Sequence, residues 1–429
     1  MMKVFHTTET GWQETLQKIL DRMHAISEEV DTAVQEIIRS VRLDGDTALM
    51  DYTAQFDRYD PRETGIVISK EQIARAKENI SIELRESLEV AAARIYAFHQ
   101  HQQEHSWITT DTEGVILGQK VGPIPGVGIY IPGGKNAFPS TLLMNVIPAR
   151  IAGVKKIVVV SPTPGGKVSQ ALLAAADIAG VESIYRIGGA QAIAALAYGT
   201  ESVPKVDKVV GPGNIYVAHA KRLLQGQIGI DAFAGPSEVL IIADSGANPH
   251  MVALDLLAQA EHDSQACTIL LTPHRALADE VMKQLGEELK SLERRDIITR
   301  ALHDHGICLI TRDLKESIDI ANNIAPEHLE LMVENAFEFL GMVENAGAIF
   351  LGYDSPEAIG DYIAGPNHTL PTGSTSRFYS PQGVYDFLKR SSIIAFSQNA
   401  LKSLGPKAVT MARAEDLEAH ARSLEYRLK

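Results

Sequence analysis

The chain has 429 residues, of which 45% are hydrophobic and 22% charged, and its formal net charge is -14. This length predicts two larger units with small appendages, and the composition is typical of a globular protein with a sizeable core. The acidic balance argues against a nucleic-acid partner, because phosphate binding needs a basic face.

The first residues, MMKVFHTTETGW, lack the apolar core of a signal peptide, and no run approaches 18 apolar residues. We therefore expect no membrane association. The two cysteines, Cys267 and Cys308, lie in the apolar segments ACTILL and GICLI. Two such thiols in a long chain indicate a reducing cytoplasm and not a disulfide framework.

Helical periodicity dominates the first 110 residues, over 28–57 and again over 69–105. From Gly114 the pattern changes to short apolar runs that alternate with amphipathic helices. The strand-like runs of this first series are VILGQKV, GVGIYIP, KKIVVVSP, SIYRIGG and VDKVVGPG. A second series begins near Glu238 and comprises EVLIIAD, CTILLT, GICLIT, LELMV and AIFLG. Continuous apolar strands separated by helices predict parallel sheets covered on both faces.

The predicted fold class is therefore α/β, with two doubly wound, Rossmann-like halves and small helical appendages at both ends. We expect an N-terminal helical appendage over 1–24, a first α/β domain from 25–129 with 239–382, and a second α/β domain over 130–238. Residues 383–429 form a C-terminal tail and helix. In its final segment, AEDLEAHARSLEYRL, apolar residues fall on one face: Leu417, Ala421, Leu424 and Leu428.

Two patterns could hold a metal ion. In LLAQAEHDS, Gln259 and His262 are three residues apart on a predicted helix and project from one face. Histidine is a common zinc ligand, whereas a glutamine oxygen is unusual, so the pair alone is more typical of a polar helix face. Asp361, in SPEAIGDYIAGPNHTLP, precedes a Gly-Pro turn and could point into a cleft or simply into solvent.

The segment NNIAPEHLELMV predicts a corner between a helix and a strand, because Pro326 disfavours a helix at Ala325. Glu327 and His328 at this corner supply two proton-transfer groups, and an imidazole suits base chemistry at neutral pH. Neighbours in a regular strand point to opposite faces, so both can serve one site only if the corner is irregular. Two exposed polar residues in a turn are the equally simple alternative.

Other histidines carry weaker signals. Glu415 and His420 lie on the terminal helix, where a histidine usually has no special role. FHQHQQEH contains His99, His101 and His105, and the last two have the i, i+4 spacing of helical zinc sites. The Gln-rich surroundings favour a solvated helix end there.

Evidence for a nucleotide is weak at the level of motifs. GPIPGVGIYIPGGKN has Gly126 and Gly128 but no glycine at position 131, so the dinucleotide fingerprint is absent, and it is not a P-loop. GGAQAIAAL and GPGNIYVAHA resemble turns from a strand to a helix, whose free amides could hold phosphate.

Taken together, the sequence resembles the histidinol dehydrogenase family over nearly the whole chain. The segments that carry the resemblance are VGPIPGVGIYIPGGKNAFPSTLLMN, GGAQAIAALAYGTESVPKVDKVVGPGN, AGPSEVLIIAD, LLAQAEHD, APEHLEL, AIGDYIAGPNHTLPT and AEDLEAHA. No one segment is decisive, but seven in the family's order are highly specific.

The resemblance implies roles for particular residues. The residues that match the family's zinc ligands are Gln259, His262, Asp361 and His420. Glu327 and His328 match its acid–base pair. Together with the four zinc ligands, the residues that match the substrate-holding groups are Ser237, His328, His368 and Glu415. The residues that match NAD contacts are Tyr130, Gln191 and Asn214.

The resemblance also implies a homodimer in which His420 completes the partner's zinc site, with one Zn²⁺ per subunit. The expected activity is the four-electron oxidation of L-histidinol to L-histidine through bound L-histidinal, with two NAD, in the cytoplasm. Three alternatives use the same residues differently: an aldehyde dehydrogenase with Cys267 as nucleophile, a zinc hydrolase with Glu327 as base, and a two-lobed binding protein.

Overall fold

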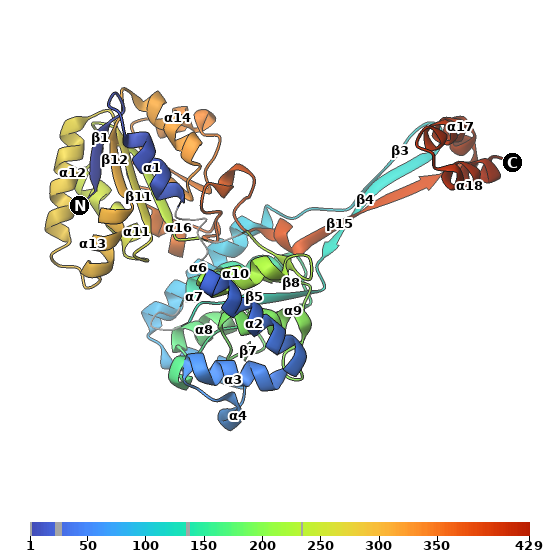
Figure 1. Ribbon diagram of the computed structural model, residues 1–429, viewed down its shortest axis with the longest axis horizontal. Helices are drawn as coiled ribbons and strands as arrows, with labels where there is room; N and C mark the ends of the chain where they lie inside the picture. Colours follow the sequence, from blue (N-terminus) through green and yellow to red (C-terminus); the bar gives the residue numbers. More distant parts are fainter. Residues whose placement is uncertain (1, 22–27, 134–137, 233–234) are drawn as a thin grey trace.

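The computed structural model describes residues 2–21, 28–133, 138–232 and 235–429. Figure 1 shows two α/β lobes and a long arm that ends in two helices. Each lobe contains a six-stranded sheet, and a three-stranded sheet forms the arm. The predicted α/β class with two doubly wound halves is therefore confirmed. None of the described helices is long and apolar enough to cross a membrane.

We call the lobe built on the second series of strands lobe A. Its sheet has the order β1-β12-β11-β10-β13-β14 and is parallel throughout. The strands are β1 (Lys3–His6), β10 (Glu238–Ala243), β11 (Cys267–Thr272), β12 (Gly306–Ile310), β13 (His328–Met332) and β14 (Ala348–Leu351). The helical segments are α1 (Trp12–Asp21), α11 (Pro249–Ala260), α12 (Arg275–Glu288), α13 (Arg295–Asp304), α14 (Leu314–Ile324), α15 (Ala336–Phe339), η4 (Leu340–Met342) and α16 (Glu357–Tyr362). Separate apolar cores on the two faces explain why the central strands are apolar along their whole length.

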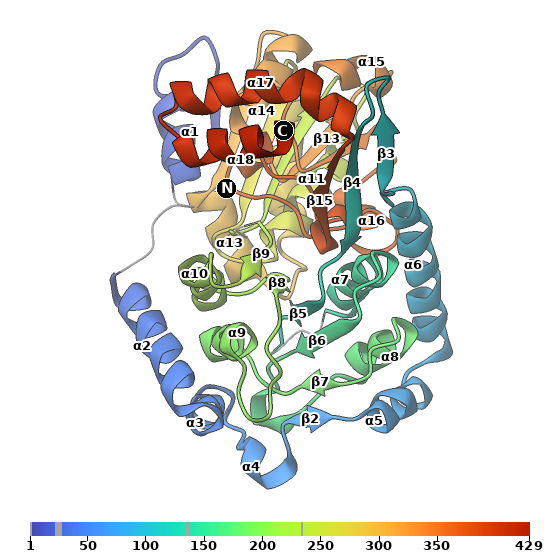
Figure 2. The same cartoon turned by 90° about the vertical axis from the view of Figure 1, so that its right-hand side faces the viewer.

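Lobe B has the sheet order β2-β7-β6-β5-β8-β9, in which only β2 runs antiparallel. Its strands are β2 (Val67–Ile68), β5 (Gly126–Tyr130), β6 (Lys156–Val160), β7 (Ile184–Tyr185), β8 (Lys208–Val210) and β9 (Gly229–Ile230). Its helical segments are α2 (Glu28–Asp44), α3 (Asp46–Asp57), α4 (Pro61–Thr64), α5 (Lys70–Arg75), η2 (Ala76–Asn79), α6 (Ile82–Gln100), α7 (Pro139–Ile151), η3 (Pro164–Gly166), α8 (Gln170–Ile178), α9 (Gly189–Tyr198) and α10 (Ile215–Leu224). Figure 2 shows these helices around the sheet.

The N-terminal helices pack differently from the expected domain division. Val34 and Leu49 belong to a core with Ile193 and Val209 of lobe B, and Ile95 belongs to its second core. Residues 28–100 therefore belong to lobe B, where their helices cover the sheet and β2 extends it, and the prediction that 25–129 join 239–382 is wrong for them. Amphipathic periodicity shows that a helix has an apolar face, but it does not show which sheet that face covers.

The first residues also depart from the expected helical appendage. Lys3–His6 form β1, which pairs in parallel with β12 at the edge of lobe A. Among the described residues of this segment, 2–21, α1 is the only helix, and its Leu16 and Ile19 enter a core of the same lobe. A four-residue edge strand has too few residues to show a clear period in the sequence.

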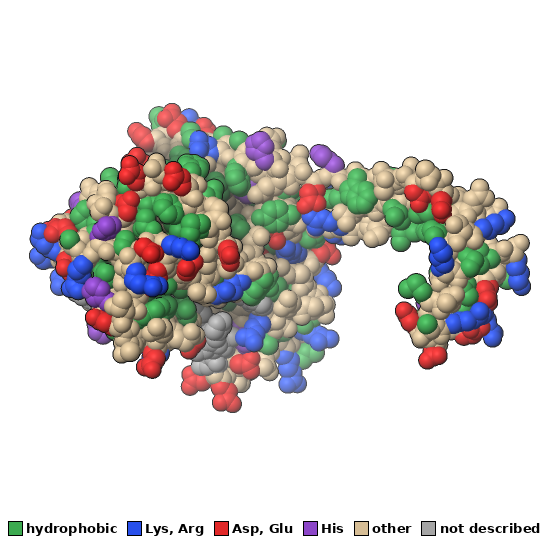
Figure 3. All heavy atoms as spheres, turned by 90° about the horizontal axis from the view of Figure 1, so that it is seen from above, with side chains coloured by type: hydrophobic (Ala, Val, Ile, Leu, Met, Phe, Trp, Pro, Cys, Tyr) green, Lys and Arg blue, Asp and Glu red, His purple; other side chains and the backbone are tan. Residues whose placement is uncertain are grey.

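The arm consists of β3 (Trp107–Thr110), β4 (Val115–Pro123) and β15 (Leu388–Phe396), followed by α17 (Gln398–Ala414) and α18 (Glu418–Leu428). Between the body and β15 lie η5 (Thr375–Arg377) and η6 (Val384–Phe387). β15 pairs with β4 along all nine residues, so two distant parts of the chain form one ribbon. Figure 3 shows that the end of the arm stands away from the body.

The expected terminal helix is interrupted. Residue Glu415 caps α17, and Asp416 has a left-handed φ of 58°, so α18 begins only at Glu418. Ala421 is buried, and Leu428 lies against Gly405 of α17. The apolar face of α18 therefore packs on the neighbouring helix of its own chain.

Candidate functional site

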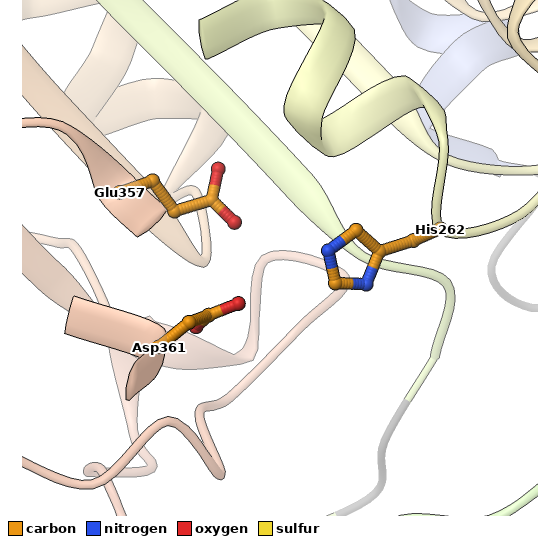
Figure 4. Close-up of side chains that lie close together, drawn as sticks. All are labelled: His262, Glu357 and Asp361. Atoms are coloured by element: carbon orange, nitrogen blue, oxygen red, sulfur yellow. The ribbon is translucent and has the colours of Figure 1, made fainter. Parts of the chain in front are cut away.

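His262, Glu357 and Asp361 converge in lobe A (Figure 4). One potential ligand atom from each lies within 4.8 Å of the others, and this is the only such group among the described residues. α11 starts at Pro249 behind the Asn248 cap and ends at Ala260, so His262 follows its last turn. Glu357 and Asp361 are four residues apart on α16 and share a face.

Gln259 joins this group from the last turn of α11, where it is fully buried. When its amide nitrogen faces Glu357, that nitrogen lies 2.6 and 2.7 Å from the two carboxylate oxygens. The amide carbonyl then points away from Glu357. A nitrogen donor from His262 and oxygen donors from Asp361 and Gln259 fit the ligand types that zinc accepts.

Glu327 and His328 lie beside this cluster at the predicted corner. α14 ends at Ile324, and Ala325 has a left-handed conformation with a φ of 54°. His328 Nδ1 donates to the Glu238 carbonyl at 2.9 Å and lies 3.6 Å from a Glu357 oxygen. The Glu238 amide donates to Glu327 at 2.8 Å. The corner is irregular, and Glu327 precedes the strand, so the two neighbouring side chains can lie together, with Glu327 Oε2 3.8 Å from His328 Nδ1.

Burial dominates the electrostatics of the site. It raises the pKa of the Glu327 and Glu357 carboxyls well above their usual range, and the nearby Asp361 carboxylate raises both further. Burial lowers the pKa of His328 to about 4, so its imidazole is neutral at pH 7. Several buried carboxyl groups lie around the exposed His262. Their oxygens would favour a bound cation at this position.

The cluster lies at the amino ends of the lobe A strands. β10 begins at Glu238 and β13 at His328, and α11 runs back along the sheet to bring its end to the same edge. In open α/β sheets ligands usually bind outside the carboxyl ends. Lobe A therefore uses the opposite edge, which the strand-end rule applied to the sequence does not predict. Ser237, directly before β10, lies half-buried at this edge.

Lobe B has its sequence-predicted residues at the usual edge. Tyr130 ends β5, Gln191 is in the first turn of α9, and Asn214 caps α10. The Gly189 amide donates to the Tyr130 hydroxyl at 3.2 Å. Asn214 accepts hydrogen bonds from two amides of α10, at 3.1 and 3.2 Å. Their contact with NAD stays a prediction.

His368 connects the two edges. Its Nδ1 donates to the Asp361 carbonyl at 3.0 Å, and its Nε2 lies 3.0 Å from the Thr141 hydroxyl. Thr141 is in the first turn of α7, the helix that follows β5 of lobe B in the chain. The amino edge of one sheet therefore faces the carboxyl edge of the other, with His368 between them.

The structure does not bring every predicted site residue to the cluster. Glu415 and His420 are exposed near the end of the arm, far from α11 and α16 of the same chain (Figure 1).

Conversely, sequence reasoning missed Glu357. The available signal was its spacing, since a glutamate four residues before Asp361 on a short helix must share the face of that residue.

The alternative sites have ordinary structural roles. Cys267 is buried in β11, and its Sγ lies 3.4 Å from the His305 carbonyl, so it is not placed as an accessible nucleophile. Burial raises the pKa of the Cys308 thiol to about 12. His99 is buried and donates to the Ile95 carbonyl at 2.8 Å, whereas His101 and His105 are exposed.

The fold and the site define a two-lobed α/β protein with a candidate metal centre and an adjacent pair of buried residues, Glu327 and His328. The family model that matches residues 20–428 is described as histidinol dehydrogenase. Proteins of that name from Syntrophotalea carbinolica and Geobacter sulfurreducens are 49% and 47% identical, and each match covers 100% of both chains. A crystal structure of histidinol dehydrogenase from Elizabethkingia anophelis matches with a TM-score of 0.93 and 37% identity, covering 100% of this chain and 98% of that one. The chain belongs to the histidinol dehydrogenase family and is an oxidoreductase.

Proposed function

We propose that this protein is a zinc-dependent enzyme of the cytoplasm. It oxidises L-histidinol to L-histidine through bound L-histidinal, uses two NAD, and performs the last step of histidine biosynthesis. Family membership supports the substrate, and the convergence of α11, α16 and β13 on one cluster supports the chemistry. That convergence is the observation on which the proposal depends.

The metal would be held by Gln259, His262 and Asp361, with His420 of the partner subunit as the fourth ligand. When bound there, zinc would orient the imidazole and amine of the substrate. Ser237 and His368, together with Glu415 of the partner subunit, would provide further substrate contacts.

His328 would remove the alcohol proton in the first oxidation. Because its Nδ1 donates to the Glu238 carbonyl, the neutral imidazole keeps Nε2 free to accept a proton. Hydride chemistry would belong to NAD, which Tyr130, Gln191 and Asn214 would hold at the carboxyl edge of lobe B.

Glu327 would act in the second oxidation as the base that helps a water molecule add to the bound aldehyde. Its carboxylate is oriented by the Glu238 amide at 2.8 Å. Retaining the aldehyde between the two oxidations would keep a reactive amino aldehyde out of solution.

The arm would complete the site of a second subunit in a homodimer. The large apolar side chains exposed on it include Trp107, Ile394 and Met411. Exposed apolar surface of this kind is typical of a protein–protein contact.

The decisive experiment counts NADH formed per histidinol consumed, before and after removal of the metal by a chelator. We expect two NADH per histidinol, loss of activity after chelation, and recovery with added Zn²⁺. One NADH per substrate, or full activity without metal, would contradict the proposal.

A further inference from the structure

Glu357 is a buried carboxylate to which neither the sequence patterns nor the proposed reaction gives a role. The residue is 3% exposed and lies at the start of α16, four residues before Asp361. It contacts Gln259 across the gap between α16 and α11. A group in this position can affect how the predicted metal ligands on both helices are presented.

The contact between Glu357 and Gln259 has a defined donor and a defined acceptor. A glutamine amide has a donor end and an acceptor end, and by itself it can turn either towards a neighbour. A carboxyl group has two oxygens, and because at most one of them carries a proton, at least one can only accept hydrogen bonds. One terminal atom of the Gln259 amide lies 2.6 and 2.7 Å from the two Glu357 oxygens. An amide oxygen there would face at least one oxygen that cannot donate, whereas the NH₂ group can donate to both, so the carboxyl group holds the NH₂ end and turns the carbonyl oxygen of Gln259 away from itself.

Glu357 is itself anchored through lobe A. Its main-chain amide donates to the Glu330 carboxyl at 2.6 Å. Glu330 lies two residues after His328 on β13 and is hydrogen-bonded to Asp255, one turn before Gln259 on α11. A chain of acidic side chains, buried at Glu330 and Glu357 and half-buried at Asp255, thus connects α11, β13 and α16, which carry Gln259, His328 and Asp361.

We propose that Glu357 is a positioning residue that orients the Gln259 amide so that its carbonyl oxygen, and not its NH₂ group, faces the metal. This inference rests on the proposed zinc site. The inference goes beyond the zinc site itself because it names the carboxylate that orients an uncommon ligand, the Gln259 amide. Residues that orient metal ligands typically change metal affinity by about 10–100-fold when they are replaced.

The test measures the zinc dissociation constant of the full chain by competition with a chromogenic chelator. We expect Glu357→Gln to weaken zinc binding by about 10–100-fold, because the new amide can pair with Gln259 in either orientation. Glu357→Asp keeps the charge but withdraws it by one methylene group, and we expect a similar loss. Thermal unfolding of the metal-free variants checks that they are folded.

The double variant Gln259→Glu with Glu357→Gln tests the polarity directly. It exchanges the two groups, so the amide introduced on α16 can donate to the carboxylate introduced on α11. The second oxygen of that carboxylate remains for the metal, and the total charge is unchanged. We expect zinc affinity to return to within about fivefold of the wild-type value, a non-additive recovery that marks direct coupling. If Glu357→Gln does not fold, Glu357→Asp and the double variant provide the test.

Three results would overturn the positioning role. If Glu357→Asp bound zinc as tightly as the wild type, Glu357 would act only through its charge and not through a directed hydrogen bond. If the double variant did not recover zinc affinity, the exchange of donor and acceptor between positions 259 and 357 would not explain the loss. A loss in Glu357→Gln as large as that in Asp361→Ala would make Glu357 a ligand. Failure of the wild-type protein to bind zinc would instead contradict the proposed function, so the two failures are distinguishable.

Discussion

At the scale of single residues, the orientation of His328 follows from one hydrogen bond. The carbonyl of Glu238 can only accept, so the 2.9 Å contact places the proton of the neutral imidazole on Nδ1. Burial lowers the pKa of His328 to about 4 and keeps the ring uncharged at neutral pH. The unprotonated Nε2 is then the ring nitrogen that could accept a proton from a substrate at the amino end of β13.

Replacing His328 tests this role. We expect His328→Ala to slow both the oxidation of histidinol and the oxidation of added histidinal, each by about 10²–10⁴-fold, as is typical for loss of a positioned general base. Separate steady-state assays with the two substrates provide the measurement. Normal turnover of either one would show that its proton is removed by another group.

The neighbouring Glu327 should affect the two oxidations unequally. We expect Glu327→Ala to reduce histidinal oxidation by about 10²-fold or more and to spare the first hydride transfer, because only the second step needs an activated water. Single-turnover experiments that follow the first and second NADH separately can measure the difference. Equal loss in both steps would argue against this division of roles.

At the scale of elements, β13 carries both a residue of the candidate site and a buried acidic residue that contributes to the stability of lobe A. It begins with His328 immediately after an irregular corner, and its third residue, Glu330, supports α16 from inside the sheet. The sheet therefore contains a buried carboxyl group in a position where an apolar residue would be expected. Burial raises the pKa of Glu330 to about 8.

This raised pKa predicts a pH dependence of unfolding. Folded Glu330 holds its proton more tightly than the unfolded chain does, so its contribution to stability is complete below the unfolded pKa and is lost as the pH rises towards about 8. Glu330→Gln keeps an acceptor for the Glu357 amide but does not titrate. The free energy of unfolding of the wild type should therefore fall relative to this variant by up to about 1.4 kcal/mol per pH unit in that window.

Urea unfolding of the metal-free proteins from acidic pH to above the folded pKa of Glu330 would measure this difference, with the exposed Glu334→Gln as the matched control. The control should follow the wild type at every pH. Parallel curves for Glu330→Gln and the wild type would show that Glu330 does not take up a proton on folding.

At the scale of the whole molecule, the arm separates His420 from the cluster of its own chain. The ribbon of β4 and β15 holds α17 and α18 away from both lobes (Figure 1). If His420 is a ligand, it can act only on the site of another copy. This requirement makes the proposed homodimer testable without a second structure.

Mixing two inactive variants provides the test. In a heterodimer of His262→Ala with His420→Ala, one site has both residues intact if His420 acts on the partner, whereas neither site is complete if it acts within its own chain. After subunit exchange we expect about a quarter of the wild-type activity, because random mixing makes half of the dimers hybrid and each hybrid has one complete site. No recovery, with exchange verified by mass spectrometry, would remove His420 from the partner's site.

Much of the candidate site could be predicted from the sequence because its signals are local or belong to the family. Pro326 placed the corner that holds Glu327 and His328, and the three-residue spacing placed Gln259 and His262 together. Glu357 was missed because a glutamate at the start of a short helix resembles a favourable charge at a helix N-terminus. Its burial becomes visible only when β13 and α11 lie against it.

The sequence by itself determined the α/β class, the two parallel sheets and the family, because continuous apolar strands and ordered motifs are properties of short segments. Only the tertiary structure decided that residues 28–100 cover lobe B, that Lys3–His6 add a strand to lobe A, and that the site lies at the amino edge of one sheet and faces the carboxyl edge of the other. Periodicity reports that a surface is buried. What buries it is decided by contacts between segments that lie far apart in the chain.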